Sequence, residues 1–598
     1  MLQSPSAIEG ACVKYRYPAL AAAGLIAGGL LVAAPATASE ESATPTTTIN
    51  GYRSVGYYGQ WRANGEAGAT IKRLFVDTPA GENLTHLNYA FGNIAGSQEA
   101  IDAAAAAGTK GLDGVQPYTC FISDGVAPAP GQTETAGDAD SDFLHRYTAA
   151  ESVLGVADSA TQPLAGNFNQ LRQLKRLYPD LKVLASLGGW SWSKSFSAAT
   201  ATPELRERLA ESCIDLYIRG NLPQIDGRGG AGSAAGIFDG FDLDWEWPGA
   251  PDWSQEVGNT VDPVNDRANF LAFVQELRDQ LDALEPETGD DYELSAFVPA
   301  SPTVISAGGW SDPALWELLD FGNLQGYDLW GSWSAETGHQ GNIHGTPEHN
   351  WGLGVDSIVA SYVSAGVDPS QLNLGLAAYG QGWSNAQPEP WTPATAGHGQ
   401  LSWDELSSRD LEYHHEYTAD GAFDATWAYD AARKEFWSLD DPTAAAEKAR
   451  WAVANGLGGV DYWDIGQDVD GDLSIAAADV LRAAAPGPVA GKAPLLCGAE
   501  SDAAPWNATA TYRNGDLVFI DGKVFQAQWY AKGSEPGSST TGPWATLTAC
   551  GVDADAVQQW YSDTIYTKGD KVEYKGKTYT AKWWTRGEAP GSAWGPWS

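Results

Sequence analysis

The run Phe238-Asp239-Gly240-Phe241-Asp242-Leu243-Asp244-Trp245-Glu246-Trp247-Pro248 alternates acidic with apolar side chains. Successive side chains of an extended strand point to opposite faces, so Asp242, Asp244 and Glu246 share one face. The aromatic and aliphatic side chains share the other face, which favours a buried strand. Buried like charges raise one another's pKa, and a carboxyl group with a raised pKa can donate a proton near neutral pH. The run therefore predicts a site of acid–base chemistry.

Two other kinds of structure also contain acidic rows. A half-exposed strand rarely has Phe, Leu and Trp on its second face. An EF-hand-like metal loop needs Gly after the third acid and a distal Glu, whereas this run has the alternation of a strand. Proton transfer is therefore the favoured interpretation of the row.

The region 51–485 alternates strand-like apolar runs with amphipathic helical runs. This alternation is typical of a parallel α/β fold, and eight strands predict a (β/α)8 TIM barrel with insertions. Catalytic side chains of such barrels follow the C-terminal ends of the strands. The expected strands are Ser54–Gly59, Thr85–Phe91, Lys182–Leu187, Phe238–Trp245, Glu293–Pro299, Leu324–Tyr327, Asn373–Tyr379 and Gly459–Trp463.

The run Asp239-x-x-Asp242-x-Asp244-x-Glu246 resembles the signature of glycoside hydrolase family 18, the family of chitinases. Ser186-x-Gly188-Gly189 resembles the family's second signature. The resemblance implies a retaining mechanism in which the substrate's own acetamido group is the nucleophile. On that basis Glu246 protonates the glycosidic oxygen, Asp244 orients and stabilises the acetamido group, and Asp242 tunes Asp244 through a shared proton.

The same resemblance implies further contacts with the sugar. Tyr327 would hydrogen-bond the acetamido oxygen, Asp328 would hold polar groups of the sugar, and Trp463 would form the floor beneath it. Each residue alone is also compatible with a structural role, as a buried Tyr, a capping Asp or a core Trp. No metal and no cofactor are expected. The other candidate substrate-binding residues of the barrel are Tyr57, Phe91, Trp190, Gln325 and Trp333, with Trp61 and Trp192 as possible outer contacts.

Two long connections interrupt the barrel pattern. Residues 384–437 fit the small α+β insertion that the family often carries beside its cleft. Residues 93–165 form a second insertion, which is rich in Gly, Ala and Asp, and the sequence does not define its role.

The N-terminus predicts export. Residues 1–38 have the basic, apolar and small-residue regions of a signal peptide, and 39–50 have the composition of a disordered lead-in. A membrane anchor is the alternative, but the apolar run is short for a span. We expect a secreted, extracellular protein with no membrane association after signal removal. Of the five cysteines, Cys12 would leave with the signal peptide. In an exported chain the other four favour the disulfides Cys120–Cys213 and Cys497–Cys550, because each pair stays within one region.

The tail contains an internal repeat. After a linker at 486–502, Trp506–Trp544 matches Trp560–Trp597, so 503–550 and 551–598 are expected to be two small all-β units. Both copies resemble the chitin-binding modules of carbohydrate-binding module families 5 and 12. By that resemblance, the residues that would contact the polymer are Trp529, Tyr530, Trp583 and Trp584.

The charge balance narrows the choice of partner. Seventy-six acidic residues against 35 basic ones give a formal charge of −41, which disfavours nucleic acid and anionic membranes. A neutral polymer is compatible with this charge. We therefore expect a secreted, monomeric chitinase that binds chitin and chito-oligosaccharides. The alternatives are an endo-β-N-acetylglucosaminidase acting on N-glycans and a non-catalytic chitin-binding protein, although the intact Glu246 disfavours the latter.

Overall fold

Eight parallel strands close into a barrel in the computed structural model, which describes residues 48–64, 68–126, 133–250, 257–288 and 290–489 and short stretches between 504 and 597. The strand order is β1-β16-β10-β9-β8-β7-β4-β2, and pairing of β1 with β2 closes the ring. The predicted (β/α)8 barrel is thus confirmed. Its strands are β1 (Arg53–Gly59), β2 (His86–Ile94), β4 (Lys182–Gly188), β7 (Gly240–Asp244), β8 (Glu293–Val298), β9 (Phe321–Leu324), β10 (Leu372–Ala377) and β16 (Gly459–Trp463).

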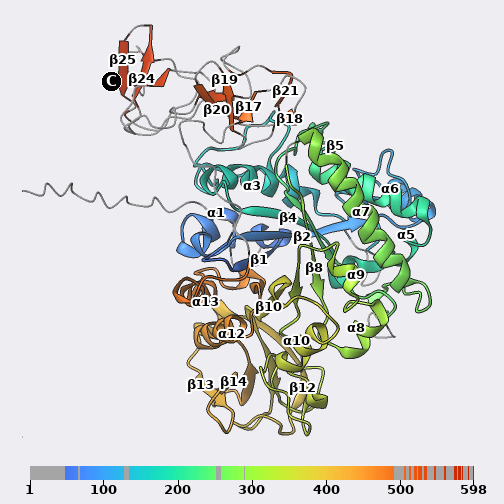
Figure 1. Cartoon of the computed structure of the whole chain (residues 1–598), viewed down its shortest axis with the longest axis vertical. Helices are drawn as coiled ribbons and strands as arrows, with labels where there is room; N and C mark the ends of the chain where they lie inside the picture. Colours follow the sequence, from blue (N-terminus) through green and yellow to red (C-terminus); the bar gives the residue numbers. More distant parts are fainter. Residues whose placement is uncertain are drawn as a thin grey trace, which may run out of the picture. The chain divides into compact units, whose positions relative to one another are not determined.

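Helices lie outside the ring of strands (Figure 1). The longest of them, α7, follows the acidic strand and has the spacing predicted from its apolar residues. The helices are α1 (Ile71–Phe75), α2 (Gln98–Ala106), α3 (Gly166–Leu177), α4 (Gly189–Trp192), α5 (Phe196–Ala199), α6 (Pro203–Cys213), α7 (Asp266–Thr288), α8 (Pro302–Gly308), α9 (Pro313–Trp316), α10 (Val355–Val363), α11 (Trp403–Ser407), α12 (Pro442–Ala454) and α13 (Asp472–Ala483).

The acidic strand β7 lies between β4 and β8. Its register pairs Asp242 with Ser186 on one side and with Ser295 on the other. Phe241 and Leu243 are fully buried on the outward face. The alternation therefore directs Asp242 and Asp244 into the barrel interior.

One predicted strand was wrong in its position. The sixth strand was expected at Leu324–Tyr327, but β9 runs from Phe321 to Leu324 and ends before the Tyr-Asp pair. Two residues past the strand, at Gly326, the backbone passes so close to β10 that a Cβ atom would lie 2.2 Å from the carbonyl oxygen of Gly375. Tyr327 and Asp328 are thus placed in the connection that follows the strand, at the carboxyl end of the barrel.

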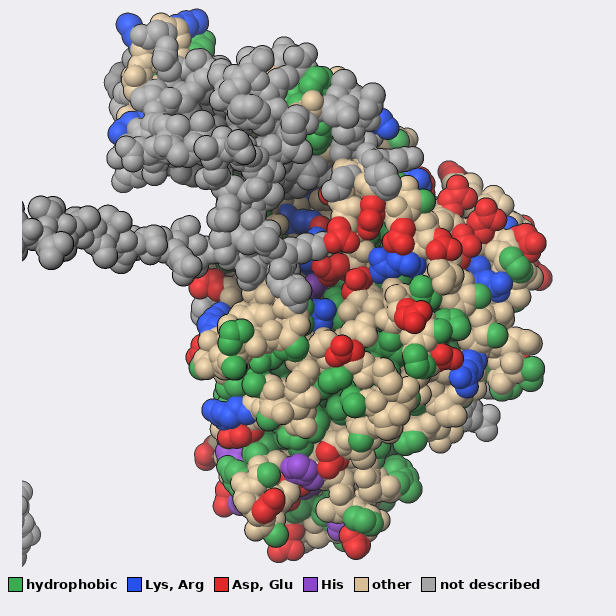
Figure 2. Space-filling view, viewed as in Figure 1, with side chains coloured by type: hydrophobic (Ala, Val, Ile, Leu, Met, Phe, Trp, Pro, Cys, Tyr) green, Lys and Arg blue, Asp and Glu red, His purple; other side chains and the backbone are tan. Residues whose placement is uncertain are grey.

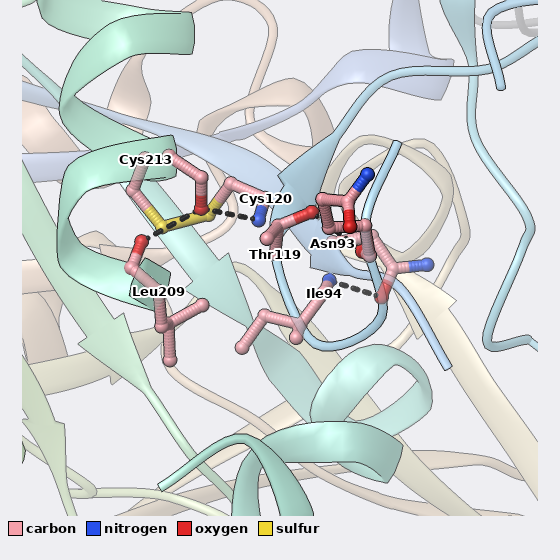
Figure 3. The surroundings of a disulfide bond; sticks show 8 residues. Asn93, Ile94, Thr119, Cys120, Leu209 and Cys213 are labelled. Carbon is pink, nitrogen blue, oxygen red and sulfur yellow. Dashed lines mark hydrogen bonds between the residues drawn. A yellow bond between two sulfur atoms is a disulfide. The ribbon is translucent and has the colours of Figure 1, made fainter. Parts of the chain in front are cut away.

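Two inserted segments add structure outside the ring. A five-stranded antiparallel sheet follows β10, and a short strand pairs with β2 in the segment between β2 and α3. In that segment the predicted disulfide Cys120–Cys213 is confirmed; it ties the short strand to the end of α6 (Figure 3). The inserted strands are β3 (Cys120–Phe121), β11 (Tyr379–Ser384), β12 (Thr395–Ser402), β13 (Glu412–Tyr417), β14 (Phe423–Asp430) and β15 (Glu435–Ser438), with a small ribbon of β5 (Leu222–Ile225) and β6 (Arg228–Gly230) after α6.

The tail contains two separate small cores. Val518, Phe525 and Trp544 pack in the first, and Val572, Tyr579 and Trp597 pack in the second. These are corresponding positions of the sequence repeat. The tail strands are β17 (Ala504–Pro505), β18 (Thr511–Tyr512), β19 (Leu517–Ile520), β20 (Lys523–Ala527), β21 (Ala531–Lys532), β22 (Trp544–Thr546), β23 (Gln558–Gln559), β24 (Lys571–Tyr574) and β25 (Lys577–Thr580).

Several predictions fall outside the described residues. They are the signal peptide, most of the lead-in, the Cys497–Cys550 pair, and the tail aromatics Trp529, Tyr530, Trp583 and Trp584. Within the described part of the chain, no helix has the length and apolar character needed to cross a membrane.

The described surface carries more acidic than basic side chains in the view of Figure 2, where Asp and Glu gather over α6 and α7. The acidic residues of these two helices include Glu204, Glu207, Asp279 and Asp282. This distribution is consistent with the excess of acidic residues in the sequence.

Candidate active site

Asp242 is fully buried and receives hydrogen bonds from several strands. The hydroxyl groups of Tyr57 and Ser186 donate to its Oδ2 over 3.0 and 2.8 Å. Ser295 donates to Oδ1 over 2.6 Å, and the Asn323 amide lies 3.5 Å from the same oxygen. Burial raises the pKa of Asp242, while these donors oppose the rise. The barrel thus stabilises a negative charge at Asp242 more than burial alone would allow.

Asp244 has far fewer partners. It is 3% exposed, and its Oδ1 has no hydrogen-bond partner among the residues that the structure describes. Burial raises the pKa of Asp244 well above its usual value, and the charges of Glu246 and Asp242 raise it further. Asp244 therefore holds a proton more readily than Asp242, and the two carboxyl groups differ in state although they lie on one strand.

Glu246 lies two residues beyond β7 and is half-buried. Its backbone N–H donates to the Ser193 hydroxyl over 3.0 Å, and its carbonyl oxygen accepts from Asn259 over 3.0 Å. Burial raises the pKa of Glu246 to about 8, and the charge of Asp328 contributes to the rise. A carboxyl group in this state is protonated at neutral pH and can act as a general acid.

The aromatic residues flanking Glu246 fix this segment. Trp245 stacks on Phe196 with ring centroids 5.0 Å apart, and Trp247 stacks on Phe297 at 5.5 Å. Both Trp side chains are buried. The alternation predicted from the sequence thus continues past the strand: the indole rings anchor the chain and Glu246 remains partly accessible.

A group of aromatic rings lies beside the acids. Trp463 stacks on Phe91 at 5.5 Å and meets the edge of Tyr57 at 5.6 Å. Trp61 lies against Phe91 in turn, with centroids 6.1 Å apart, and is 41% exposed. Trp463, at the end of β16, therefore contacts both of the other predicted substrate-binding residues of this group, Tyr57 on β1 and Phe91 on β2.

Tyr327 and Asp328 follow β9 and lie near the acids of β7. The Tyr327 ring stacks on Phe297 at 6.1 Å, and Gln381 donates to the Asp328 carboxylate over 2.7 Å. Burial raises the pKa of Asp328, and the bonds from Gln381 and Tyr379 oppose the rise. The predicted pair thus lies near the acidic row of Asp242, Asp244 and Glu246, as the electrostatic influence of Asp328 on Glu246 also indicates.

The remaining predicted residues differ in exposure. Trp190 on α4 is 37% exposed and Trp333 is 60% exposed, so both present apolar surface to solvent. Gln325 accepts a hydrogen bond from the backbone N–H of Ala300 over 3.2 Å, which gives it a structural contact. Among the described residues, no group of three or more His, Cys, Asp and Glu side chains is arranged to hold a metal.

Several residues of the site were not predicted. Ser186, Ser295 and Asn323 surround Asp242, and Phe297 joins Trp247 to Tyr327. The available signal was the alternation of side chains along a strand, because each of these residues occupies a position whose side chain points into the barrel. Alternation alone does not identify which inward residues meet across a barrel, since that depends on the register between strands.

Comparison with known proteins agrees with this arrangement. The family model described as Glycosyl hydrolases family 18 matches residues 53–468. A second model, Carbohydrate-binding module family 5/12, matches residues 559–598, which is the second tail unit.

Individual relatives cover different parts of the chain. Chitinase C of Streptomyces lividans is 31% identical over 429 residues, which are 70% of this chain and 58% of that protein. Chitinase A1 of Niallia circulans is 28% identical over 531 residues, which are 83% of this chain and 68% of that protein. The solved catalytic domain of chitinase B from Arthrobacter TAD20 is 46% identical with a TM-score of 0.67; the match covers 75% of this chain and all of that one. The chain spans 58–60% of the length of the two Streptomyces chitinases that it matches.

Proposed function

This chain belongs to glycosyl hydrolases family 18, and on that premise we propose that it is a chitinase, which cleaves β-1,4 linkages between N-acetylglucosamine units of chitin. The observation that carries the proposal is Glu246, a partly accessible carboxyl group whose pKa is raised to about 8, beside an aromatic floor. Aromatic rings can hold a sugar by stacking against it, and a protonated acid beside them can then donate its proton to the glycosidic oxygen.

The proposal gives each acid a role that its surroundings support. Glu246 donates its proton to the leaving oxygen. The substrate's acetamido oxygen then attacks the anomeric carbon, so the glycosidic bond breaks as a cyclic oxazolinium forms, with retention after water adds. In this proposal Asp244 passes its proton to Asp242 as the intermediate forms, and the resulting Asp244 carboxylate stabilises the positive charge of that intermediate. The Tyr327 hydroxyl donates to the acetamido oxygen and orients it for attack.

The most direct test is hydrolysis of chitin hexasaccharide, followed by NMR for the anomer and by chromatography for product size. Early β-anomeric products support retention through the acetamido group. Early α-anomeric products contradict the mechanism. If the oligosaccharide binds without being cleaved, the chain is instead a chitin-binding protein.

The match to a chitin-binding module at 559–598 supports action on a polymer rather than on N-glycans. We also infer that 503–550 is a second module, because Val518, Phe525 and Trp544 occupy the core positions of Val572, Tyr579 and Trp597. Two linked modules raise the local concentration of the enzyme on an insoluble surface. Export through the N-terminal segment fits this substrate.

Deletion of residues 503–598 tests the role of the tail. We expect the shortened enzyme to lose more activity on solid chitin than on the soluble hexasaccharide, because only the solid substrate presents a surface to which the tail can bind. Equal losses on the two substrates would indicate a structural tail instead.

A further inference from the structure

Glu246 lies beyond the paired part of its strand, so other contacts must set its position. The strand β7 ends at Asp244, two residues earlier. The backbone N–H of Glu246 donates to the Ser193 hydroxyl, and its carbonyl oxygen accepts from the Asn259 amide, each over 3.0 Å. Two side chains from other parts of the chain therefore bind the backbone of the acid that the proposed reaction needs.

Asn259 joins Glu246 to the turn that carries Trp190. It is 3% exposed, and its Nδ2 donates to the carbonyl oxygens of Glu246 and Trp190, each over 3.0 Å. An amide nitrogen carries two hydrogens, so both are used, and two carbonyl acceptors permit only this orientation of the amide. One buried amide thus holds the backbone of the acid and the backbone of an exposed aromatic residue together.

Ser193 connects the same two segments on the other side of Glu246. This residue follows α4 and is fully buried. Its hydroxyl, which accepts from the Glu246 N–H, also lies 2.9 Å from the carbonyl oxygen of Gly189 and 3.0 Å from that of Asp244. Because Gly189 begins the helix that contains Trp190, both backbone polar groups of Glu246 are linked to the region of that turn.

The turn is also bound from two further directions. The backbone N–H and the hydroxyl of Thr260 donate to the carbonyl oxygen of Lys194, over 3.3 and 2.6 Å. From the inserted segment between β2 and α3, whose role the sequence did not define, Thr133 donates to the Ser191 carbonyl oxygen over 2.6 Å, and Glu134 pairs with Lys194 over 2.7 Å. The inserted segment therefore supports the turn, and the buried amide ties the turn to the acid.

We propose that Asn259 is a positioning residue of the active site, which fixes the Glu246 carboxyl group with respect to a sugar unit bound against the exposed Trp190 indole. This inference rests on the proposed chitinase reaction and concerns the same site. Asn259 acts through the backbone of Glu246 and does not touch the substrate. A general acid must lie within hydrogen-bond distance of the oxygen that it protonates, and a displacement of about 1 Å can lower the rate about 10²-fold.

The test compares Asn259→Leu with the same change at Asn342, a matched residue outside the candidate active site. Asn342 precedes α10, is 4% exposed, and its Nδ2 donates to the carbonyl oxygens of His344 and Leu353 over 2.9 and 3.0 Å. The Oδ1 atoms of both asparagines are buried without a hydrogen-bond partner among the described residues. Leu has the same branched shape but no donor, so each variant loses two bonds of one kind and we expect similar falls in Tm.

The two variants should differ in turnover of chitin hexasaccharide. We expect kcat to fall about tenfold to 10²-fold in Asn259→Leu, with a smaller change in KM, and to stay within about twofold of the wild type in Asn342→Leu. Equal kcat values in the two folded variants would overturn the proposal, because the amide of Asn259 would then serve only the fold.

A double-mutant cycle with Trp190→Ala tests the link between the acid and the exposed indole. In Asn259→Leu the alignment of the two is already lost. The further change Trp190→Ala should therefore lower kcat/KM by a smaller factor in this variant than in the wild type. Losses that multiply would contradict the proposal, since they would mean that the two residues act independently.

Two further comparisons keep the result decisive. If Asn259→Leu does not fold, Asn259→Ala removes the same amide without adding bulk and is compared with Asn342→Ala in the same way. Failure of the wild type to cleave the hexasaccharide would count against the proposed function. Cleavage by the wild type with an unchanged kcat in the folded Asn259 variants would count against the role of Asn259 alone.

Discussion

The two ends of the barrel interior contain the same kinds of acidic side chain in opposite states. At the amino end, Glu293 on β8 accepts a hydrogen bond from His86 over 2.8 Å and lies near Lys182 and Arg53. Burial alone would raise the pKa of Glu293, but these basic groups hold it at about 2. This acid is ionised throughout the physiological range.

At the carboxyl end, the ionisable groups that act on Asp244 and Glu246 are other acids. Asp242 and Glu246 act on Asp244, and Asp328 acts on Glu246. Burial and these like charges raise the pKa values at this end. The partners of an acid in this barrel, rather than its burial, therefore decide whether it stabilises the fold as an ion or retains a proton for chemistry.

Replacing Glu246, the acid at the carboxyl end whose pKa is about 8, should cause the largest loss of activity. We expect Glu246→Gln to lower kcat on chitin hexasaccharide by about 10²- to 10⁴-fold, the usual contribution of a general acid. Binding of the oligosaccharide, measured by calorimetry, should remain, since the shape of the site is kept. Turnover at the wild-type rate would exclude Glu246 as the acid.

Removing the phenolic donor should have the next largest effect on activity. Tyr327→Phe keeps the ring that stacks on Phe297 and deletes only the hydroxyl group. We expect kcat to fall about 10²-fold, as when one preorganised donor is removed from a developing charge. Steady-state kinetics with a Tm measurement checks this; a loss of Tm that parallels the loss of kcat would point to packing instead.

At the amino end, the corresponding change should affect stability and not catalysis. Glu293→Gln removes the anion that accepts from His86 and acts on Lys182 and Arg53, and we expect a loss of about 3 kcal/mol in the free energy of unfolding. The kcat of the folded protein should not change. If Glu293→Gln lowered kcat as much as Glu246→Gln does, the division between the two ends would be refuted.

The same variant has a defined pH dependence. The pKa of Glu293 is lower in the folded state, at about 2, than in the unfolded chain, at about 4.3. Its contribution is therefore complete above the unfolded value and is lost as the pH falls toward 2. We would measure the free energy of unfolding by chemical denaturation between about pH 6 and about pH 3. It should decline less for Glu293→Gln than for the wild type.

The smallest effect is a shift in the pH profile. Glu246 must be protonated to donate, so activity should fall as the pH rises through about 8. Asp328→Asn removes a charge that raises this pKa, so the alkaline limb should move to lower pH, whatever the absolute rate. Asp279→Asn, on the exposed face of α7, controls for a simple change in net charge and should leave the limb in place.

Local patterns predicted much of the molecule because they depend on neighbours in the chain. The alternation around β7 identified its buried strand, its inward acids and the anchoring Trp245 and Trp247. The eight strands were found from their apolar runs, and only β9 was misplaced, because Phe321-Gly322-Asn323-Leu324 has few residues typical of strands.

Contacts across the barrel were decided by the tertiary structure alone. Ser186, Ser295 and Asn323 converge on Asp242 only because the four neighbouring strands β4, β7, β8 and β9 are aligned in one register. The same closure leaves both carboxyl oxygens of Asp461 on β16 without a hydrogen-bond partner among the residues that the structure describes, although nothing in its local sequence distinguishes it from a solvated Asp.

The sequence by itself thus determined which residues alternate, which acids share a face and which segments form strands, since these follow from backbone geometry over a few residues. The tertiary structure decided which acids meet a cation and which meet another acid. That distinction sets the pKa of Glu293 at about 2 and of Glu246 at about 8, because charge interactions in a buried interior depend on distances between residues far apart in the chain.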